Sequence, residues 1–342
     1  MTVTRAGRRT ARRAAVVLPL TAGLAVAGAA PASAHEAWFV HHPESYPLDW
    51  SALASPATLA GIAVAAVLAV VWRVVAQHVP SDLPPLRRLS ALVPYVPRLL
   101  AAHLGASLLL LSWDGAVLDP GARLSGGGAE LLLLVPQVVT GSLLLLGVAV
   151  RAAALAVVAA GPVLLSLQGP RALLTCAVIV GVALFLVAVP PRRRDHGRAL
   201  LDRAHLRPAL LALRLGAAVS LLSLAVVEKL ANPAMGVAMI EQQPVLNLLS
   251  PVGVDAETFV LVAGVVELLF GLLVLSGAAP QVVGLVAAVP FTASLALFGM
   301  TELMGHLPVY GVLLVFVVLG SRPSTAAEVS YLPHRGDPVL AR

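Results

Sequence analysis

Long apolar runs separated by short polar segments make up most of the chain. The runs reach about 18 residues or more, which is the length that an α-helix needs to cross roughly 30 Å of hydrocarbon. Leu, Val and Ala dominate these runs. The pattern predicts an all-α, polytopic membrane protein with about nine transmembrane helices. We place these helices at residues 57–76, 97–113, 130–149, 151–168, 172–190, 208–231, 257–277, 281–299 and 303–320.

Composition agrees with this class of protein. Hydrophobic residues make up 59% of the chain and charged residues only 12%, whereas a soluble domain is close to a quarter charged. The net charge of +6 would suggest nucleic-acid binding in a soluble protein. Here the arginines gather in short segments between apolar runs, as the positive-inside rule describes. We therefore predict contact with the lipid bilayer and no nucleic-acid partner.

The N-terminus is typical of a secretory signal peptide. Five arginines lie within residues 5–13, an apolar stretch fills 14–30, and Ala32-Ser33-Ala34 is a cleavage site of the small-x-small type. We expect residues 1–34 to be removed and residues 35–56 to form an extracytoplasmic segment that contains His and Trp. An uncleaved anchor helix is the alternative interpretation.

The basic residues predict the orientation in the membrane. With an exported N-terminus the first helix begins outside, so segments 77–97, 191–207 and 321–342 lie inside, and they hold most of the arginines. The expected outside loops contain only Arg123 and Arg171. By the positive-inside rule this distribution predicts a multi-pass protein of a bacterial-type inner (plasma) membrane, with an extracytoplasmic mature N-terminus and a cytoplasmic C-terminus.

The chain also shows an internal duplication. The sequence HLGA at 103–106 resembles RLGA at 214–217, and DPG at 119–121 corresponds to NPA at 232–234. Both copies begin on the inside, so the repeats are parallel, unlike the inverted repeats of many transporters. The expected domains are a first helix at 57–76, a first four-helix bundle at 97–190, a basic cytoplasmic loop at 191–207, a second four-helix bundle at 208–320 and a cytoplasmic tail at 321–342.

Only the second expected bundle keeps ionisable side chains at membrane depth, so we place the function there. Glu267 lies in the middle of its helix, where an ionised and unpaired carboxyl costs about 3 kcal/mol or more. It must face the bundle interior, be protonated or be paired. Glu228 and Lys229 lie near the outer end of the preceding helix, and we assign them to substrate binding.

Glu302, His306 and Tyr310 follow one another at intervals of four residues, so they share one helical face. Together with Glu267 across the bundle they suit a proton-coupled redox site, where imidazole and carboxyl groups exchange protons with a quinone or a thiol. We assign these four residues to catalysis. The alternative is a structural network in which Lys229 neutralises a glutamate and His306 and Tyr310 satisfy each other.

Short motifs within residues 208–320 resemble the DoxX-like family of four-helix membrane proteins. They are EKLANP at 228–233, GVVE at 264–267 followed by Gly271, and GHLPVYG at 305–311. The first half resembles a degenerate copy. That family includes subunits linked to thiosulfate:quinone oxidoreductases and to other membrane oxidoreductase complexes. The resemblance therefore implies a quinone-linked redox role, with a quinone or a redox protein as partner and electrons arriving at the outer face.

Histidines after the expected cleavage site offer a second possibility. Cleavage would leave His35 at the N-terminus, with His41 and His42 close by. Nitrogen ligands of this kind suit Cu(II), although a plain Trp-anchored segment on the membrane surface is an equally simple interpretation. The single cysteine, Cys176, lies in an apolar run, and we expect it to be a small core residue.

Three functions remain open from the sequence. The first is an integral membrane subunit of a quinone-linked oxidoreductase system, the second is extracytoplasmic copper handling or transport, and the third is a structural or assembly role in a membrane redox complex. Whether the chain is itself an enzyme stays open. Quinone and copper are the candidate ligands.

Overall fold

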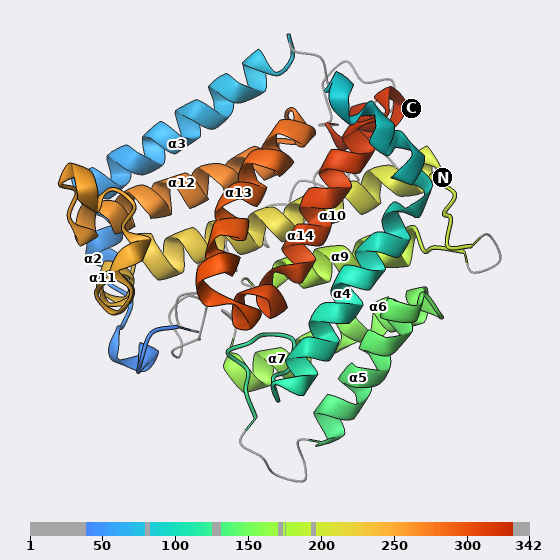
Figure 1. The fold of residues 1–342 in the computed structure, drawn as a ribbon, viewed down its shortest axis with the longest axis horizontal. Coiled ribbons are helices and arrows are strands. Elements are labelled where there is room, and N and C mark those ends of the chain that lie inside the picture. The colour runs from blue at the N-terminus through green and yellow to red at the C-terminus, as the bar shows by residue number, and fades with distance from the viewer. Residues whose placement is uncertain are drawn as a thin grey trace, which may run out of the picture.

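A computed structural model gives the fold of the chain (Figure 1). The structure describes residues 39–78, 83–124, 131–169, 174, 176–192 and 196–330. Within these ranges the regular secondary structure is helical, and β pairing is confined to an isolated bridge between Ala116 and Arg123. The expected signal peptide and His35 lie outside the described residues, as does the end of the expected tail.

The helices follow the expected apolar runs closely. In chain order they are η3 (Pro43–Ser45), α2 (Trp50–Leu53), α3 (Pro56–Val75), η4 (Pro84–Tyr95), α4 (Val96–Trp113), α5 (Leu131–Leu146), α6 (Val150–Ala159), α7 (Gly161–Gln168), α9 (Ala177–Ala188), α10 (Arg203–Leu224), η7 (Ala225–Leu230), α11 (Pro233–Gln242), η8 (Pro244–Leu246), η9 (Ser250–Val252), α12 (Ala256–Ser276), α13 (Pro280–Phe298), α14 (Met300–Gly320) and α15 (Pro323–Val329).

Among the described residues, six helices are long and apolar enough to cross a membrane. They are Pro56–Val75, Pro84–Trp113, Arg203–Leu230, Ala256–Ser276, Pro280–Phe298 and Met300–Gly320. Three shorter apolar helices, Leu131–Leu146, Val150–Ser166 and Ala177–Ala188, lie where the remaining spans were expected. The all-helical class and the multi-pass membrane character are confirmed, whereas six helices rather than nine have the length of a span.

The two expected halves share helix–helix interfaces rather than standing apart. In the first half α4 packs on α5 and α6 packs on α9, and in the second α10 packs on α12 and α13 packs on α14. The largest contacts between the halves join α9 to α10 and α4 to α14. Figure 1 shows α3 beside α12 at one edge and α5 beside α4 at the other. The interior of the molecule therefore lies between the halves.

Paired glycines allow two of these helix crossings. A Cβ on Gly216 of α10 would lie 2.5 Å from the Ala177 carbonyl oxygen and 2.8 Å from Cα of Gly181 in α9. In the same way, a Cβ on Gly105 of α4 would lie 2.6 Å from the carbonyl oxygen of Gly141 in α5. Small residues let helix backbones approach closely in membranes, where packing rather than the hydrophobic effect holds helices together.

Arginine side chains cap helix ends at one pole of the molecule. Arg214 of α10 is almost completely buried, and it donates to the carbonyl oxygens of Leu275 at 2.8 Å and Val329 at 2.9 Å. Glu328 of α15 pairs with Arg203 and Arg207. Cations near the last carbonyls of a helix satisfy acceptors that have no partner within the helix. These contacts hold α15 against α10 and the end of α12.

Two aspartates begin helices at the opposite pole. Asp255 caps α12 and accepts a hydrogen bond of 2.8 Å from the backbone N–H of Thr258. This bond, with a second from the Thr258 hydroxyl, lowers the pKa of the Asp255 carboxyl. Asp49 caps α2, and the hydroxyl of Ser51 is the main cause of the lowered pKa of its carboxyl. An Asp cap is expected at helix starts outside the hydrocarbon.

The segment before α3 packs against the connection that follows η7. The backbone N–H of Asp49 donates to the Ala231 carbonyl oxygen at 2.7 Å, and the amide of Asn232 donates to the Tyr46 carbonyl oxygen at 3.0 Å. Val40 joins an apolar cluster with Met235 of α11. The segment before α3 and the connection after η7 thus form one folded cap.

We predict that Gly216→Val destabilises the fold by about 1–3 kcal/mol, because the added methyl groups would separate α9 from α10. Leu215→Val is the matched control, since it introduces the same branched residue one position away, on a side chain that is exposed in the structure. Thermal unfolding of the purified proteins in detergent measures the difference. Equal melting temperatures for both variants would contradict this account of the crossing.

Candidate functional site

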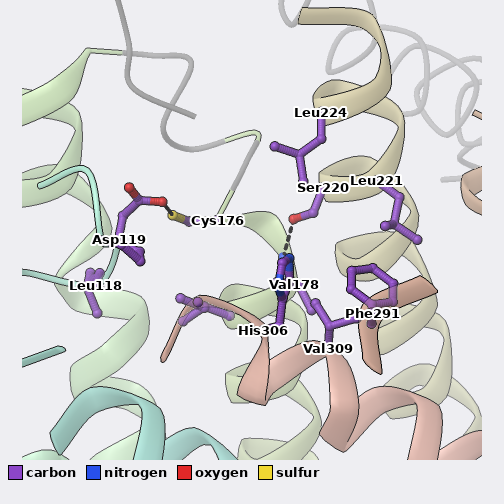
Figure 2. A pocket seen from close by; sticks show the side chains of 13 residues that line it. Leu118, Asp119, Cys176, Val178, Ser220, Leu221, Leu224, Phe291, His306 and Val309 are labelled. Atoms are coloured by element: carbon purple, nitrogen blue, oxygen red, sulfur yellow. Dashed lines mark hydrogen bonds between the residues drawn. The ribbon is translucent and has the colours of Figure 1, made fainter. Parts of the chain in front are cut away.

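A small cavity lies where the two halves meet. Most of its lining is apolar, and we call it the polar cavity because Asp119, Cys176, Ser220 and His306 also line it. Its volume is about 40 Å³. Figure 2 shows Asp119 beside Cys176, with Ser220 and His306 farther along the same cavity. The lining residues come from the loop after α4, the start of α9, and helices α10, α13 and α14. The cavity therefore combines elements that are distant in sequence.

His306 and Glu302 form a buried ionisable pair beside this cavity. Their exposed fractions are 3% and 0%, and His306 Nδ1 lies 3.2 Å from Glu302 Oε1. Residues four apart in a helix lie on one face, so the geometry of α14 holds them together. Glu302 lies in the first turn of α14, where the helix dipole favours a negative charge. The Phe291 ring meets the imidazole edge-on at 4.8 Å.

Asp119 and Cys176 occupy another part of the polar cavity, and both are buried. The thiol donates to Asp119 Oδ2 at 3.5 Å, and Asp119 Oδ1 accepts from the Gly121 N–H at 2.7 Å. Ser220 of α10 accepts from the Val178 N–H at 2.9 Å. That N–H belongs to the first turn of α9, so the N–H group has no acceptor within its own helix. The cavity lining thus includes an imidazole, a thiol, a hydroxyl and the Asp119 carboxyl, and the Glu302 carboxyl lies behind His306.

Sequence reasoning did not assign Asp119, Cys176 or Ser220 to the site. Asp119 belongs to the DPG motif at 119–121 that marked the duplication, and an acid at a repeated position was an available signal. For Cys176 and Ser220 there was no such signal. Their proximity depends on the crossing of α9 and α10, which no local pattern encodes.

Glu267 and Lys229 form a second, separate ion pair. Lys229 Nζ lies 3.0 Å from Glu267 Oε2, and both side chains are mostly buried. Lys229 and Glu228 belong to η7, a π-helical turn that continues α10, and Glu228 is fully buried. A Cβ on Gly264 would lie 2.9 Å from Cβ of Lys229, so this glycine lets η7 approach α12.

The structure divides the expected four-residue catalytic group. Glu302 and His306 lie together, while Glu267 lies with Lys229 and makes no hydrogen bond or ion pair with His306 in the described part of the chain. The Tyr310 hydroxyl donates to the Phe291 carbonyl oxygen at 2.6 Å, which ties α14 to α13. Helix packing separates Glu267 from His306, because α12 packs mainly on η7, α10 and α3, whereas α14 packs mainly on α13 and α4.

The histidines considered for copper are on the surface. His41 and His42 are exposed, and His35 lies outside the described residues. Among the described residues, no group of three or more His, Cys, Asp or Glu side chains is arranged to hold a metal ion. The donor set in the described residues therefore does not fit a copper site, and no step below depends on a metal.

We predict that Lys229→Met lowers the free energy of unfolding by about 3 kcal/mol, because it leaves Glu267 without its cation in an apolar bundle. The double variant Lys229→Met/Glu267→Gln should recover most of that loss, since it removes the uncompensated charge as well. Melting in detergent of both variants and of Glu267→Gln alone completes the cycle. A double variant that is no more stable than Lys229→Met would contradict the pairing.

No family model, curated protein or solved structure matches this chain. The site is therefore described by the geometry of the two ion pairs and the polar cavity. His306 belongs both to the sequence motif at 305–311 and to the cavity lining.

Proposed function

We propose that this chain is an integral membrane subunit of a quinone-linked oxidoreductase system, DoxX-like in its second half. The observation that carries the proposal is the buried Glu302–His306 pair beside a polar cavity inside an apolar helical bundle. Ionisable residues in such bundles are costly and usually serve ion or proton transfer. A quinone-linked system needs protons at membrane depth, which is what this pair can supply.

The chemistry of the pair is proton transfer. Reduction of a quinone to a quinol consumes two electrons and two protons. In the proposal a redox partner supplies the electrons, while His306 gives and regains the protons, because an unperturbed imidazole exchanges its proton near neutral pH. Glu302 orients the ring through its contact of 3.2 Å with Nδ1. Asp119 and Cys176 line the same cavity and extend the set of groups that can exchange protons.

The size of the polar cavity limits what it holds. A water molecule needs roughly 10–15 Å³ of such space, so about 40 Å³ admits a few waters. Pockets for drug-sized ligands measure about 300–1,000 Å³. The polar cavity therefore serves as a water-filled proton path, and a quinone ring would have to bind beside it.

The proposal includes the nine-span topology with two duplicated halves, an extracytoplasmic mature N-terminus and a cytoplasmic C-terminus in the plasma membrane. The three shorter apolar helices complete the count. Arg73, Arg203, Arg207 and Arg214 gather at the pole that holds α15, which supports a cytoplasmic assignment for that pole.

A structural or assembly role in a membrane redox complex is the second candidate. The observation that favours it is the Lys229–Glu267 pair, because mutual neutralisation at 3.0 Å explains both charges without any chemistry. The hydrogen bond from the Tyr310 hydroxyl to the Phe291 carbonyl oxygen also favours a structural role, because it joins α14 to α13. In this alternative Glu302 and His306 only join helices, and their variants would reduce protein level rather than activity.

We predict that His306→Gln and Glu302→Gln each lower quinone reduction in membrane vesicles by about 100-fold or more, because proton transfer by a positioned group contributes about 10²–10⁴-fold. The assay follows quinone absorbance with thiosulfate, the donor that the family resemblance suggests, and then with NADH. Activity is divided by the amount of folded protein, measured by immunoblot after size-exclusion chromatography.

His205→Gln is the matched control, because it makes the same change on an exposed ring at the surface, and it should keep full activity. Quinone extracted from protein purified in mild detergent provides independent support. If the two site variants accumulate normally and reduce quinone at the control rate, the proposed function is wrong. If only their protein levels fall, the structural alternative replaces it.

A further inference from the structure

A second, larger cavity lies on the other side of the loop that lines the polar cavity, and we call it the apolar chamber. Its volume is about 340 Å³, which is within the range of small-molecule pockets. Helices α4, α5, α6 and α7 line it together with Val117 and Leu118. Leu, Val, Ala and Pro supply most of the lining, and Gln137 and Thr140 are its polar members.

Two prolines, Pro136 and Pro162, lie in the helices that surround this space. Pro136 lies inside α5, where a proline removes a backbone hydrogen bond and bends the helix. On the facing side, α6 ends at Ala159 and α7 begins with Gly161-Pro162, so that span is interrupted at about the same level. Pro136 and Ala160 both line the chamber.

The chamber opens on the lipid-facing side of the bundle. Leu132 at its rim is 75% exposed, and Ala156 and Ala159 are exposed as well. In a bilayer these side chains meet acyl chains rather than water. None of the described residues that line the chamber is charged. A ligand with a phosphate or an ammonium group would therefore find no partner there, and a neutral molecule fits best.

Leu118 separates the two cavities, because it lines both of them. Its φ of 61° is in the left-handed region, which is uncommon for a residue with a branched side chain. Gln137 fixes this conformation: its oxygen accepts from the Leu118 N–H at 3.0 Å, and its nitrogen donates to the Ala116 carbonyl oxygen at 2.9 Å. Strained residues held in this way occur often at functional sites.

We propose that the apolar chamber receives a neutral, lipid-soluble molecule directly from the bilayer, and that Leu118 is the barrier between this molecule and the polar cavity. The molecule has a hydrocarbon body, which the Leu, Val and Ala lining accommodates, and a hydrogen-bonding head, which Thr140 can contact. As a substrate route this inference rests on the proposed function, because His306 would then act on the head of the molecule. As a binding site for such a molecule, the chamber does not depend on the proposed function.

Cys176 provides a reporter for the route, since it is the single cysteine of the chain and lines the polar cavity. The experiment measures the rate of its modification in membranes by mass spectrometry. Neutral N-cyclohexylmaleimide adds to the thiol, and, in parallel, a charged trimethylammonium methanethiosulfonate forms a mixed disulfide with it and releases methanesulfinate. Leu118→Gly removes the side-chain barrier, and glycine adopts the positive φ of this position without strain. We predict that this variant reacts with the neutral reagent about tenfold faster than the unaltered protein, with no comparable gain for the charged reagent.

A matched pair of substitutions on α6 tests whether the route passes through the chamber. Ala156→Phe, made in the Leu118→Gly background, fills the lipid-facing side of the chamber and should return the labelling rate to its original value. Ala152→Phe makes the same change one turn earlier, at an exposed residue outside the lining, and should leave the faster rate unchanged. Equal rates for these two variants, or equal gains for both reagents, overturn the proposal.

A second measurement avoids any dependence on the Leu118→Gly variant. We expect 1-decanol, a neutral molecule with a hydrocarbon body, to raise the melting temperature of the unaltered protein and of Ala152→Phe, but not of Ala156→Phe. The same shift in all three proteins would contradict binding in the chamber. Neither measurement follows quinone reduction, so this inference and the proposed function can fail independently.

Discussion

Hydrocarbon offers no hydrogen bonds, so each polar group within the bundle needs a partner in the protein. This constraint accounts for the arrangement of the ionisable residues. Glu302 has His306 at 3.2 Å, Glu267 has Lys229 at 3.0 Å, and Arg214 has two backbone carbonyl oxygens. Each contact joins groups whose isolated burial would cost several kcal/mol. The positions of these pairs then restrict how the helices can pack.

Packing between the halves explains why the polar cavity lies where it does. The contacts of α9 with α10 and of α4 with α14 bring the loop after α4 and the start of α9 next to α14. Asp119 and Cys176 come from the first half, and His306 comes from the second. Neither half forms this cavity by itself.

Patterns that depend on local geometry were predictable from the sequence. Apolar run length located the helices because hydrocarbon thickness fixes the length of a span, and four-residue spacing predicted the Glu302–His306 contact because it follows from helical pitch. The sequence also offered Lys229 as the partner of Glu267 or Glu228, but the choice between them depends on a π-helical turn and on a close approach at Gly264. The roles of Cys176 and Ser220 depend on a crossing of helices, for which the sequence has no local signal.

The two ion pairs contain different cationic groups, a lysine ammonium in one and a histidine imidazole in the other. Lys229 and Glu267 carry full opposite charges whose attraction holds η7 against α12, and transferring a proton between them would remove that attraction. An imidazole differs because it exchanges protons near neutral pH while keeping its hydrogen-bonding geometry. His306 lies beside a space that admits water. We therefore propose that proton chemistry belongs to α14 and that the acid on α12 is part of the scaffold.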